Sequence, residues 1–339
     1  MEKRLNMILE LTSFCNLKCG HCLREQDEFS GFYQTYDSIL QILDKIQEFH
    51  KSYSNIELKL SGGEATIWRE SGKNIQDIFF ECKKRNLPFS LVSNGVVFNN
   101  QDMVKRYLGK YVESGNKIKI YLTIDNFHGN YDVQTMRSKI LDNLLSYMQE
   151  YKALIDLYVQ STFCTDDKHN LPQEFIRYYT DKGVKFMVNP LLPWGKGMKF
   201  KNIVPTLQVG SVDKSTLGAY KNYLYILGKN LNKWNNYYEF EKLSNWELLK
   251  MFNYCGESLV IENSKVYYCM GMSGKAEFLI SDIKDFSFNK YVAFKDSNDV
   301  CQFWRTGELD FLYPQFLGKY VAFGYGVCDL CRKIQMKKS

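Results

Sequence analysis

No stretch of the 339-residue sequence reaches the roughly 18 consecutive apolar residues that a membrane-spanning helix needs, so we expect no membrane partner. A signal peptide is missing too, because the chain starts with the charged residues Glu2, Lys3 and Arg4 and no small-residue cleavage site follows. These absences favour a cytoplasmic protein. Neither sign of charge dominates, since 44 Lys and Arg stand against 38 Asp and Glu. The basic residues are scattered, which indicates solvated faces, and we expect no nucleic-acid partner.

The composition is that of a globular protein, with 45% hydrophobic and 24% charged residues, so neither a disordered nor a fibrous class is favoured. Its unusual component is a set of ten cysteines. A reducing compartment does not support a disulfide framework, and patterned cysteines there serve as metal ligands or catalytic thiols. The spacing of the cysteines therefore carries most of the functional argument.

Strand-like and helical patterns alternate between Asn6 and about Asn189. The expected strands are Met7–Leu11, Ile56–Ser61, Pro88–Val92, Lys117–Ile124, Ile155–Thr162 and Val184–Val188. The expected helices are Tyr36–Lys51, Asn74–Arg85, Asp102–Tyr111, Val133–Tyr151 and Pro172–Lys182. This α/β alternation predicts a parallel sheet with right-handed crossovers, whose functional loops follow the carboxyl ends of the strands.

The pattern changes near Tyr254, where two short strands, Ser258–Ile261 and Lys265–Tyr268, predict a hairpin. Aromatic-rich segments follow and end in two more cysteines. We therefore expect three parts: a first domain over residues 1–199, a bridging segment over 200–253, and a small cysteine-bearing domain over 254–339.

The first cysteine group is Cys15, Cys19 and Cys22, which begins four residues after the first strand ends at Leu11. Three thiolates in one loop suit a [4Fe–4S] cluster with one iron left open for a substrate or cofactor. A zinc site is an alternative, but His21 is poorly placed to join the same tetrahedron as both neighbouring cysteines. Ordinary buried cysteines are the other alternative.

With this spacing and an aromatic residue, here His21, before the third cysteine, the chain resembles the radical S-adenosylmethionine (SAM) superfamily. The resemblance implies a partial (βα)6 TIM-like barrel. It also implies that the open iron chelates SAM, which one electron cleaves to methionine and a 5′-deoxyadenosyl radical that abstracts hydrogen from a substrate. A flavodoxin or ferredoxin would supply that electron.

Further motifs of this family follow the strands in order. Gly62, Gly63 and Glu64, after the second strand, resemble the segment that receives the methionine ammonium, because glycines permit close approach and a carboxylate pairs with a cation. Ser93 and Asn94, after the third strand, resemble the segment that faces the sulfonium and ribose.

The fourth strand is followed by Asp125 and His128, which resemble the family segment whose aspartate holds the ribose hydroxyls; a simple hairpin turn is the alternative. Asn189 ends the sixth strand, where family members bind adenine through the backbone. Each motif alone is weak, but four in the right order at successive strand ends support one another.

The second cysteine group is Cys255, Cys269, Cys328 and Cys331. Four thiolates suit either zinc or a fully ligated [4Fe–4S] cluster, and core thiols are a further alternative. Beside a SAM-cleaving cluster, the arrangement resembles the twitch form of the SPASM domain, which holds one auxiliary cluster. The family has a glycine five residues before the second cysteine, and this chain has Ser264 there.

We hold three hypotheses for the function. The leading one is modification of a ribosomally made peptide by epimerisation or cross-linking. The early position of the first cysteine group, together with Asp125 and His128 after the fourth strand, resembles the layout of peptide epimerases. Met270 stands where those enzymes have a hydrogen-donating cysteine, so Cys164, past the fifth strand, is an alternative donor or simply a core residue. We take Cys164 and His128 as the candidate catalytic residues. The other hypotheses are a dehydrogenase or epimerase of a small sugar-like metabolite, and a non-enzymatic zinc-binding adaptor.

Overall fold

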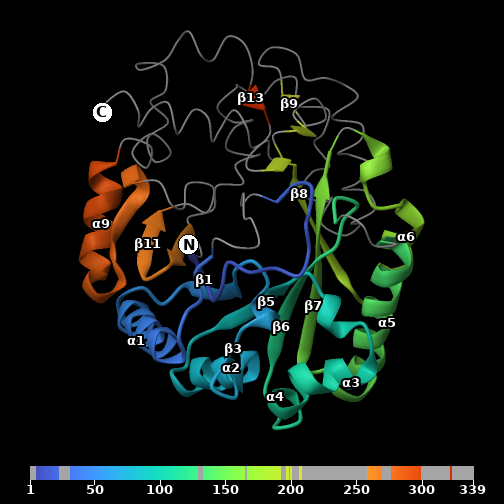
Figure 1. Cartoon of the computed structure of the whole chain (residues 1–339), viewed down its shortest axis with the longest axis horizontal. Helices are drawn as coiled ribbons and strands as arrows, with labels where there is room; N and C mark the ends of the chain where they lie inside the picture. The colour runs from blue at the N-terminus through green and yellow to red at the C-terminus, as the bar shows by residue number, and fades with distance from the viewer. Residues whose placement is uncertain are drawn as a thin grey trace.

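The computed structural model shows a curved nine-stranded sheet with helices along its outer side (Figure 1). The structure describes residues 5–22, 31–128, 133–164, 166–191, 196–197, 199–200, 206–207, 258–268, 276–298 and 321–322. Within these residues the strand order is β12-β11-β10-β1-β2-β5-β6-β7-β8. The strands are β1 (Leu5–Glu10), β2 (Ile56–Ser61), β5 (Phe89–Ser93), β6 (Ile118–Thr123), β7 (Ile155–Phe163), β8 (Lys185–Pro190), β10 (Ser258–Glu262), β11 (Lys265–Tyr268) and β12 (Leu279–Asp282).

The strands β1, β2, β5, β6, β7 and β8 pair in parallel, each with the next, which confirms the predicted α/β class. The helices that connect them include α1 (Tyr36–Ser52), α2 (Ile75–Lys84), α5 (Val133–Tyr151) and α6 (Gln173–Asp181). The sheet is not closed on itself, because β8 and β12 are its edges in the described part of the chain. An open, partial barrel is thus the architecture that the sequence predicted.

Polar side chains fix the starts of these helices. Thr35 caps α1 by accepting a hydrogen bond from the Ser38 amide at 3.1 Å. Asn74 and Asp77 form a capping box at α2, in which each side chain accepts from the backbone of the helix start. Each cap satisfies amides that have no partner inside the helix, so the helices begin where the sequence pattern places them.

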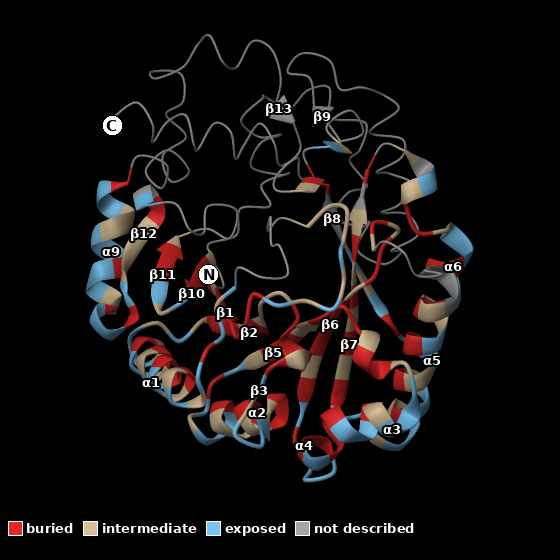
Figure 2. Ribbon diagram, viewed as in Figure 1, coloured by how far each residue is buried: buried red, intermediate tan, exposed pale blue. Residues whose placement is uncertain are grey.

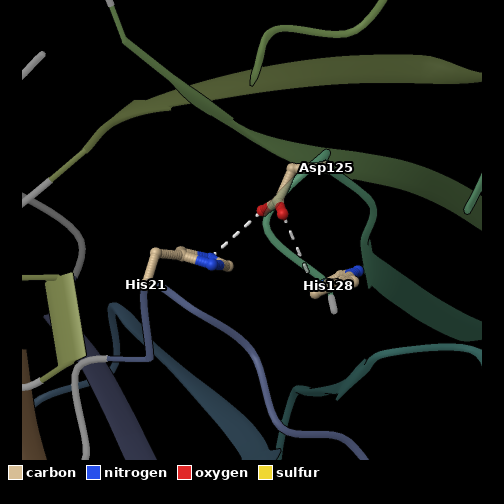
Figure 3. Close-up of side chains that lie close together, drawn as sticks. All are labelled: His21, Asp125 and His128. Atoms are coloured by element: carbon tan, nitrogen blue, oxygen red, sulfur yellow. Dashed lines mark ion pairs between the residues drawn. The ribbon is translucent and has the colours of Figure 1, made fainter. Parts of the chain in front are cut away.

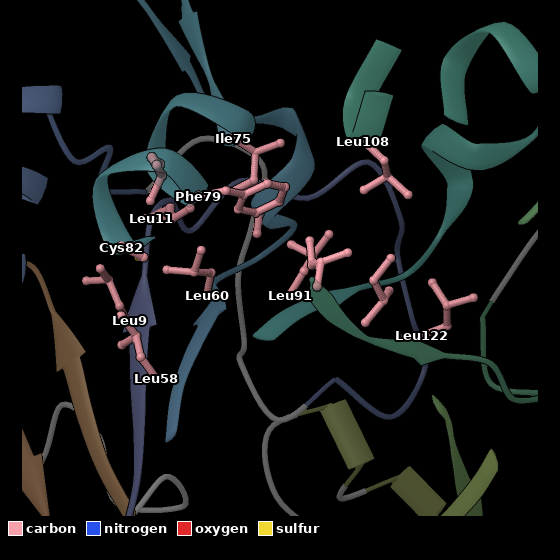
Figure 4. Close-up of a cluster of buried hydrophobic side chains, with 14 of the residues drawn as sticks. Leu9, Leu11, Leu58, Leu60, Ile75, Phe79, Cys82, Leu91, Leu108 and Leu122 are labelled. Carbon is pink, nitrogen blue, oxygen red and sulfur yellow. The ribbon is translucent and has the colours of Figure 1, made fainter. Parts of the chain in front are cut away.

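The two faces of the sheet differ because alternate residues of a strand point to opposite sides. On the helix-covered face, leucines from successive strands form one buried apolar cluster (Figure 4). Cys82 of α2, which had no predicted role, is part of this cluster. Figure 2 shows that buried residues are concentrated in the strands, whereas exposed residues lie on the outer sides of the helices.

The opposite face of the sheet is polar. Lys119 Nζ of β6 lies 3.0 Å from Glu57 Oε1 of β2, and Lys59 Nζ lies 5.2 Å from the centre of the Tyr121 ring. The rings of Tyr121 and Tyr158 lie 5.0 Å apart. Parallel barrels usually fill this face with branched apolar side chains, so its polarity here suits an interior that accommodates polar groups.

The helix expected over Asp102–Tyr111 is present, but its hydrogen-bonding pattern changes along its length. It consists of α3 (Gln101–Val104), a π-helical turn η3 (Lys105–Gly109) and α4 (Lys110–Val112). The buried side chain of Gln76 donates to the Arg106 carbonyl at 2.6 Å and accepts from the Tyr111 amide at 3.1 Å. These bonds satisfy backbone groups on either side of the widened turn, which the sequence pattern did not predict.

The predicted hairpin near the C-terminus is confirmed as β10 and β11, and its position in the sheet is new. β10 pairs in parallel with β1, in a register that sets Asn6 beside Ser258. Both turn residues have positive φ, 47° at Asn263 and 61° at Ser264. This left-handed region favours glycine, which explains why the family has glycine at the second position.

The expected boundary at residue 254 stays a prediction, but the described residues beyond it join the main core. Helix α9 (Phe288–Ser297) lies beside α1 (Figure 1). The ring of Phe49 in α1 lies 5.1 Å from Phe286 and 5.6 Å from Tyr291. All three side chains are buried, so this aromatic cluster attaches the segment around α9 to the barrel.

Replacing Phe49 by Ala tests this attachment. We expect the variant to lose about 3–5 kcal/mol of unfolding free energy, because the substitution leaves a cavity between α1 and α9. Chemical denaturation followed by circular dichroism measures this value. The exposed Gln41 on the same helix provides the control, since Gln41→Ala should stay within about 0.5 kcal/mol of wild type. A loss below about 1 kcal/mol for Phe49→Ala would contradict the attachment.

Candidate functional site

The three cysteines of the first group lie in a loop that follows β1, as predicted, and all three are half-buried free thiols. The Cys15 sulfur accepts hydrogen bonds from the Leu17 amide at 3.4 Å and from Asn94 Nδ2 at 3.7 Å. The Cys22 amide donates to the Cys19 carbonyl at 3.4 Å, which turns the chain between these two cysteines. N–H donors to sulfur are a feature of iron–sulfur sites, where they tune the cluster.

The electrostatics of the loop favour neutral thiols when no cation is bound. Burial raises the pKa of Cys15 to about 11, and Glu64 and Cys22 add to the shift. Burial also raises the pKa of Cys19, and Asp125 and the other two cysteines contribute. A positive charge bound between these thiols would lower their pKa values and favour the thiolate forms that ligate a metal. The residues therefore fit the cluster that the sequence resemblance implies.

Gly62 and Gly63 hold the cysteine loop against the end of β2. The Gly63 amide donates to the Thr12 carbonyl at 2.7 Å, and a Cβ at Gly63 would lie 2.2 Å from the Phe14 carbonyl oxygen. Gly62 has a φ of 139°, and a Cβ there would lie 2.3 Å from the Thr12 carbonyl oxygen. The structure therefore gives these glycines a packing role toward the loop, while their predicted contact with SAM stays a prediction.

Glu64 is buried and its carboxylate links two strand ends. Oε1 accepts from Ser93 Oγ at 2.8 Å and from the Thr66 amide at 3.0 Å. Oε2 accepts from the Asn94 amide at 2.7 Å. Burial raises the pKa of Glu64 more than these hydrogen bonds lower it. Its predicted pairing with the methionine ammonium stays a prediction, and the observed role is to tie the end of β2 to the end of β5.

Asn94 connects the end of β5 to the cysteine loop. Its Nδ2 donates to Asn16 Oδ1 at 2.8 Å as well as to the Cys15 sulfur, and its Oδ1 accepts from the Val96 amide at 3.0 Å. The hydroxyl of Ser93 accepts from the Gly95 amide at 3.0 Å. Ser93 and Asn94 thus face the predicted site, and Asn16 is a partner that the sequence pattern did not identify.

Asp125 lies between the two histidines of the site (Figure 3). His21 Nε2 lies 3.1 Å from Asp125 Oδ2, and His128 Nε2 lies 3.9 Å from Asp125 Oδ1. The Phe127 amide donates to Oδ1 at 2.9 Å. The Asp125 side chain is only 2% exposed, whereas that of His21 is 18% exposed. His21 Nδ1 is buried and has no hydrogen-bond partner among the described residues.

Asp125 is the negatively charged member of the group that it forms with His21 and His128. Burial raises the pKa of Asp125, but His128, His21 and the hydrogen bonds lower it further, so the net shift is downward and Asp125 is ionised at neutral pH. Burial lowers the pKa of His128, and Asp125 offsets only part of this shift. His128 is therefore neutral at neutral pH, and its imidazole can accept or donate one hydrogen bond.

One further contact attaches the cysteine loop to the loop after β6, and another attaches that second loop to α5. The Gly20 amide donates to the Phe127 carbonyl at 2.9 Å. Arg137 of α5 donates to the Asp125 carbonyl and, at 2.6 Å, to Asn126 Oδ1. Arg137 was not predicted, because nothing in a helical pattern marks one arginine as an anchor for a distant loop.

Residues from the ends of several strands meet at a cavity of about 20 Å³. It is lined by Leu17, Asn94, Val96, Thr123, Ile124, His128, Met136, Arg137 and Ile140. The cysteine loop, the end of β5 and the end of β6 therefore converge, as the sequence predicted for motifs at successive strand ends.

The remaining predicted site residues that the structure describes do not line this cavity. Cys164 is fully buried beside Phe127 and Leu191, and its thiol donates to the Asp166 carbonyl at 3.3 Å. This environment is that of a core residue, so its role as a hydrogen donor stays a prediction. Asn189 lies in β8, in register with Thr162 of β7. The second cysteine group, Cys255, Cys269, Cys328 and Cys331, lies outside the described residues.

Comparison with known proteins identifies the domain that holds the site. Residues 9–163 match the model of the family described as Radical SAM superfamily. An S-adenosylmethionine-dependent nucleotide dehydratase from Psychrobacter lutiphocae is 26% identical over 134 residues, which cover 37% of this chain and 43% of the relative. A tungsten-containing aldehyde ferredoxin oxidoreductase cofactor-modifying protein from Pyrococcus furiosus is 28% identical over 202 residues, which cover 55% of this chain and 51% of the relative. The chain spans about half the length of these curated relatives.

Among solved structures, SuiB from Streptococcus suis, bound to precursor peptide SuiA, is similar with a TM-score of 0.54. The match covers 100% of this chain and 74% of that chain at 13% sequence identity, so the likeness concerns the fold. None of the helices in the described residues is long and apolar enough to cross a membrane.

Replacing Gly63 by Ala tests how the loop is held. The new Cβ would overlap the Phe14 and Ser13 carbonyl oxygens, so the cysteine loop must shift. We expect affinity for the cluster to fall on the order of 10–100-fold, as for other changes that misplace metal ligands. Iron and sulfide content after anaerobic reconstitution measures this.

Gly115 provides the matched control, because it has a φ of 76° and a Cβ there would meet nothing within 4 Å. Gly115→Ala should lose about 1–2 kcal/mol of stability through backbone strain and keep its iron. Equal iron content in both variants would show that the contact between Gly63 and the loop is not needed for cluster binding.

Proposed function

This chain is an enzyme with a Radical SAM domain over residues 9–163, and on that premise we propose that it reductively cleaves SAM in order to modify a ribosomally made peptide. The observation that carries the proposal is the convergence of the three cysteines with Asn94 and Asp125 at one end of the sheet. When bound, the cluster and SAM would supply a 5′-deoxyadenosyl radical for hydrogen abstraction. A zinc-binding adaptor, the third hypothesis, does not agree with a chain that is an enzyme.

The protein's own residues would hold and orient these groups. Cys15, Cys19 and Cys22 provide three thiolate ligands, which leaves one iron of a [4Fe–4S] cluster open for SAM. The Asn94 side chain donates to a cluster ligand and stands between the loop and the end of β5. Glu64 keeps that strand end in place. The network thus fixes the loop before SAM binds, so little ordering is needed at the moment of reaction.

A peptide is the substrate class that we propose. The described part of the chain is similar in fold to SuiB, with a TM-score of 0.54, and SuiB is bound to a precursor peptide in the solved structure. The polar face of the sheet, with Lys59, Tyr121 and Tyr158, offers hydrogen-bond donors and aromatic rings to a polar chain. Epimerisation and cross-linking both begin with hydrogen abstraction, so both outcomes belong to the proposal.

A small metabolite is the second candidate substrate. It is favoured by the match to a nucleotide dehydratase, which is 26% identical over 134 residues. That match covers 37% of this chain, so it concerns the SAM-cleaving domain more than a substrate site.

The second cysteine group and the electron donor complete the proposal. Cys255, Cys269, Cys328 and Cys331 would hold an auxiliary [4Fe–4S] cluster, because four thiolates complete its ligation. A reduced flavodoxin or ferredoxin would supply the electron for SAM cleavage. The cytoplasmic location predicted from the sequence agrees with such donors.

Anaerobic reconstitution tests the reaction. We expect about eight irons per chain, on the basis of four per cluster, and formation of 5′-deoxyadenosine from SAM with dithionite. Replacing Cys15, Cys19 and Cys22 together by Ala should abolish this product, whereas Cys82→Ala, in the apolar core, should leave it. A peptide encoded beside the gene should gain solvent deuterium if it is epimerised, or lose two hydrogens if it is cross-linked.

Different outcomes contradict different parts of the proposal. About four irons per chain with SAM cleavage intact would contradict the proposed auxiliary cluster. Zinc in place of iron, with no SAM cleavage, would contradict the proposed radical reaction. Unchanged peptide together with conversion of a nucleotide would favour the second candidate.

We also propose that Asp125 acts on SAM through His21 and does not hold the ribose hydroxyls. An aspartate that binds a ribose should present an accessible oxygen, but this carboxylate is 2% exposed and has His21, His128 and the Phe127 amide as neighbours. Because an ionised carboxylate only accepts, His21 Nε2 carries the proton and donates to it. The bond fixes the orientation of the His21 ring, which is 18% exposed and whose Nδ1 has no hydrogen-bond partner among the described residues, and this ring would contact SAM.

A double-mutant cycle tests this role. Asp125→Asn and His21→Phe, made singly and together, should affect SAM binding non-additively, with a coupling of about 1–3 kcal/mol. Anaerobic titration of the reconstituted protein with SAM gives the binding free energies. As the control, a 2′-deoxy analogue of SAM should lose the same binding free energy in wild type and in Asp125→Asn. The ribose contact would be established instead by two results together. The 2′-deoxy analogue would lose less binding free energy in Asp125→Asn than in wild type, and the effects of Asp125→Asn and His21→Phe on SAM binding would be additive.

A further inference from the structure

A cavity of about 320 Å³ among the described residues lies outside the predicted SAM site. It is formed between the short hairpin of β3 (Arg69–Glu70) and β4 (Lys73–Asn74) and the π-helical turn η3. We call it the hairpin pocket, and its lining residues are Arg69, Glu70, Ser71, Gly72, Lys73, Asn74, Arg106 and Tyr107. Nothing in the proposed reaction uses these residues.

The charge of the hairpin pocket is positive. Three of its lining residues, Arg69, Lys73 and Arg106, are cationic and exposed, and Glu70 is its only carboxylate. The Glu70 carboxylate accepts from the Tyr36 amide, so it is directed to the start of α1. Lys73 Nζ lies 3.8 Å from Asp77 Oδ1, but the Lys73 side chain is still 45% exposed. Such a surface attracts negative charge from solution.

The hairpin pocket is held rigidly. The Tyr33 hydroxyl contacts both the amide and the carbonyl of Arg69, which fixes the hairpin strand. The Arg69 guanidinium donates to the buried Tyr107 hydroxyl. Gln76 holds the backbone of the π-helical turn at Arg106. Because the backbone that carries these cations is already fixed, a partner does not have to order it on binding, and π-helical turns often occur at functional sites.

The hairpin pocket is connected to the cysteine loop through exposed aromatic rings. Tyr33 forms a β-bridge with Thr12, and its ring lies 6.4 Å from the ring of Phe14 and 6.2 Å from that of Trp68. Phe14 is 39% exposed and Tyr33 is 41% exposed. Phe14 directly precedes Cys15, so this surface leads from the hairpin pocket to the first cluster ligand.

We propose that Phe14, Tyr33 and the hairpin pocket form the docking surface of an acidic electron-transfer protein. The proposal rests on the proposed function, which needs one electron for each SAM cleaved. Complementary charge steers a partner to a surface and raises its association rate, and electron-transfer encounters need only a small interface. The reduced donor loses one electron and the cluster gains it, and no other group is transferred. An acidic segment of the peptide substrate is the competing occupant, which the experiment distinguishes.

The experiment compares two reductants in the reconstituted full-length protein. Reduced flavodoxin must dock, whereas dithionite is a small molecule and needs no docking surface. Arg106→Glu and Lys73→Glu, singly and together, should lower the flavodoxin-driven rate of 5′-deoxyadenosine formation by about 10- to 100-fold at low ionic strength. Added salt should reduce the difference, because it screens exposed charges. The dithionite-driven rate and the KM for the peptide should stay within about twofold of wild type.

Lys139→Glu provides the matched control, because Lys139 is exposed on α5 and does not line the hairpin pocket. It changes the net charge by the same amount as either single variant and should keep the flavodoxin-driven rate. Calorimetric titration with oxidised flavodoxin gives a second readout, in which only the Arg106 and Lys73 variants should bind more weakly.

Each other outcome overturns the proposal in a recognisable way. Unchanged flavodoxin-driven rates would place the donor elsewhere. Equal losses with both reductants would assign these residues to the fold or the cluster. A higher KM for the peptide under dithionite would assign the hairpin pocket to the substrate. A wild-type protein that does not cleave SAM even with dithionite would contradict the proposed function itself, independently of the docking surface.

Discussion

The close contact between the backbone at Gly62 and Gly63 and the backbone at residues 12–14 is the constraint on which the site depends. The Gly63 amide donates to the Thr12 carbonyl at 2.7 Å, and there is no room for a Cβ at either glycine. This contact places the cysteine loop directly over the end of β2. The contacts of the loop with Asn94 at β5 and with Asp125 beyond β6 both require that position.

The same constraint explains why buried polar groups are tolerated at this end of the sheet. Glu64 and Asp125 are each almost completely buried, which would be costly without partners. Glu64 instead accepts a hydrogen bond from the Asn94 amide at the end of β5, and Asp125 accepts one from the Phe127 amide in its own loop and lies beside His21. The first ties β2 to β5, and the second ties the loop after β6 to His21. The site is therefore fixed by its own polar network, and this network is also where a bound cofactor would meet the protein.

The sequence predicted the parallel sheet, its helices and the residues that gather at the strand ends, because these depend on local periodicity and on motifs in order along the chain. It did not predict that β10 pairs with β1, or that Arg137 anchors the loop at Asp125. Such long-range contacts depend on which surfaces meet in the folded chain, and local patterns do not report them. The roles of single residues were least predictable: the Asp125 carboxylate contacts His21, a pairing that the sequence pattern did not indicate, and its contact with the ribose hydroxyls stays a prediction.

The polarity of the inner face of the sheet links the fold to the choice of substrate. A closed barrel fills its interior with apolar side chains, but this sheet is open at β8 and β12 in the described residues and carries Lys119, Glu57 and Tyr121 inside. An open polar interior next to a fixed cysteine loop would let a substrate chain reach the reacting atoms. The electron, by contrast, would enter from the outer side, through Phe14. Substrate and electron donor would thus approach the cysteine loop from different faces and would not compete for one surface.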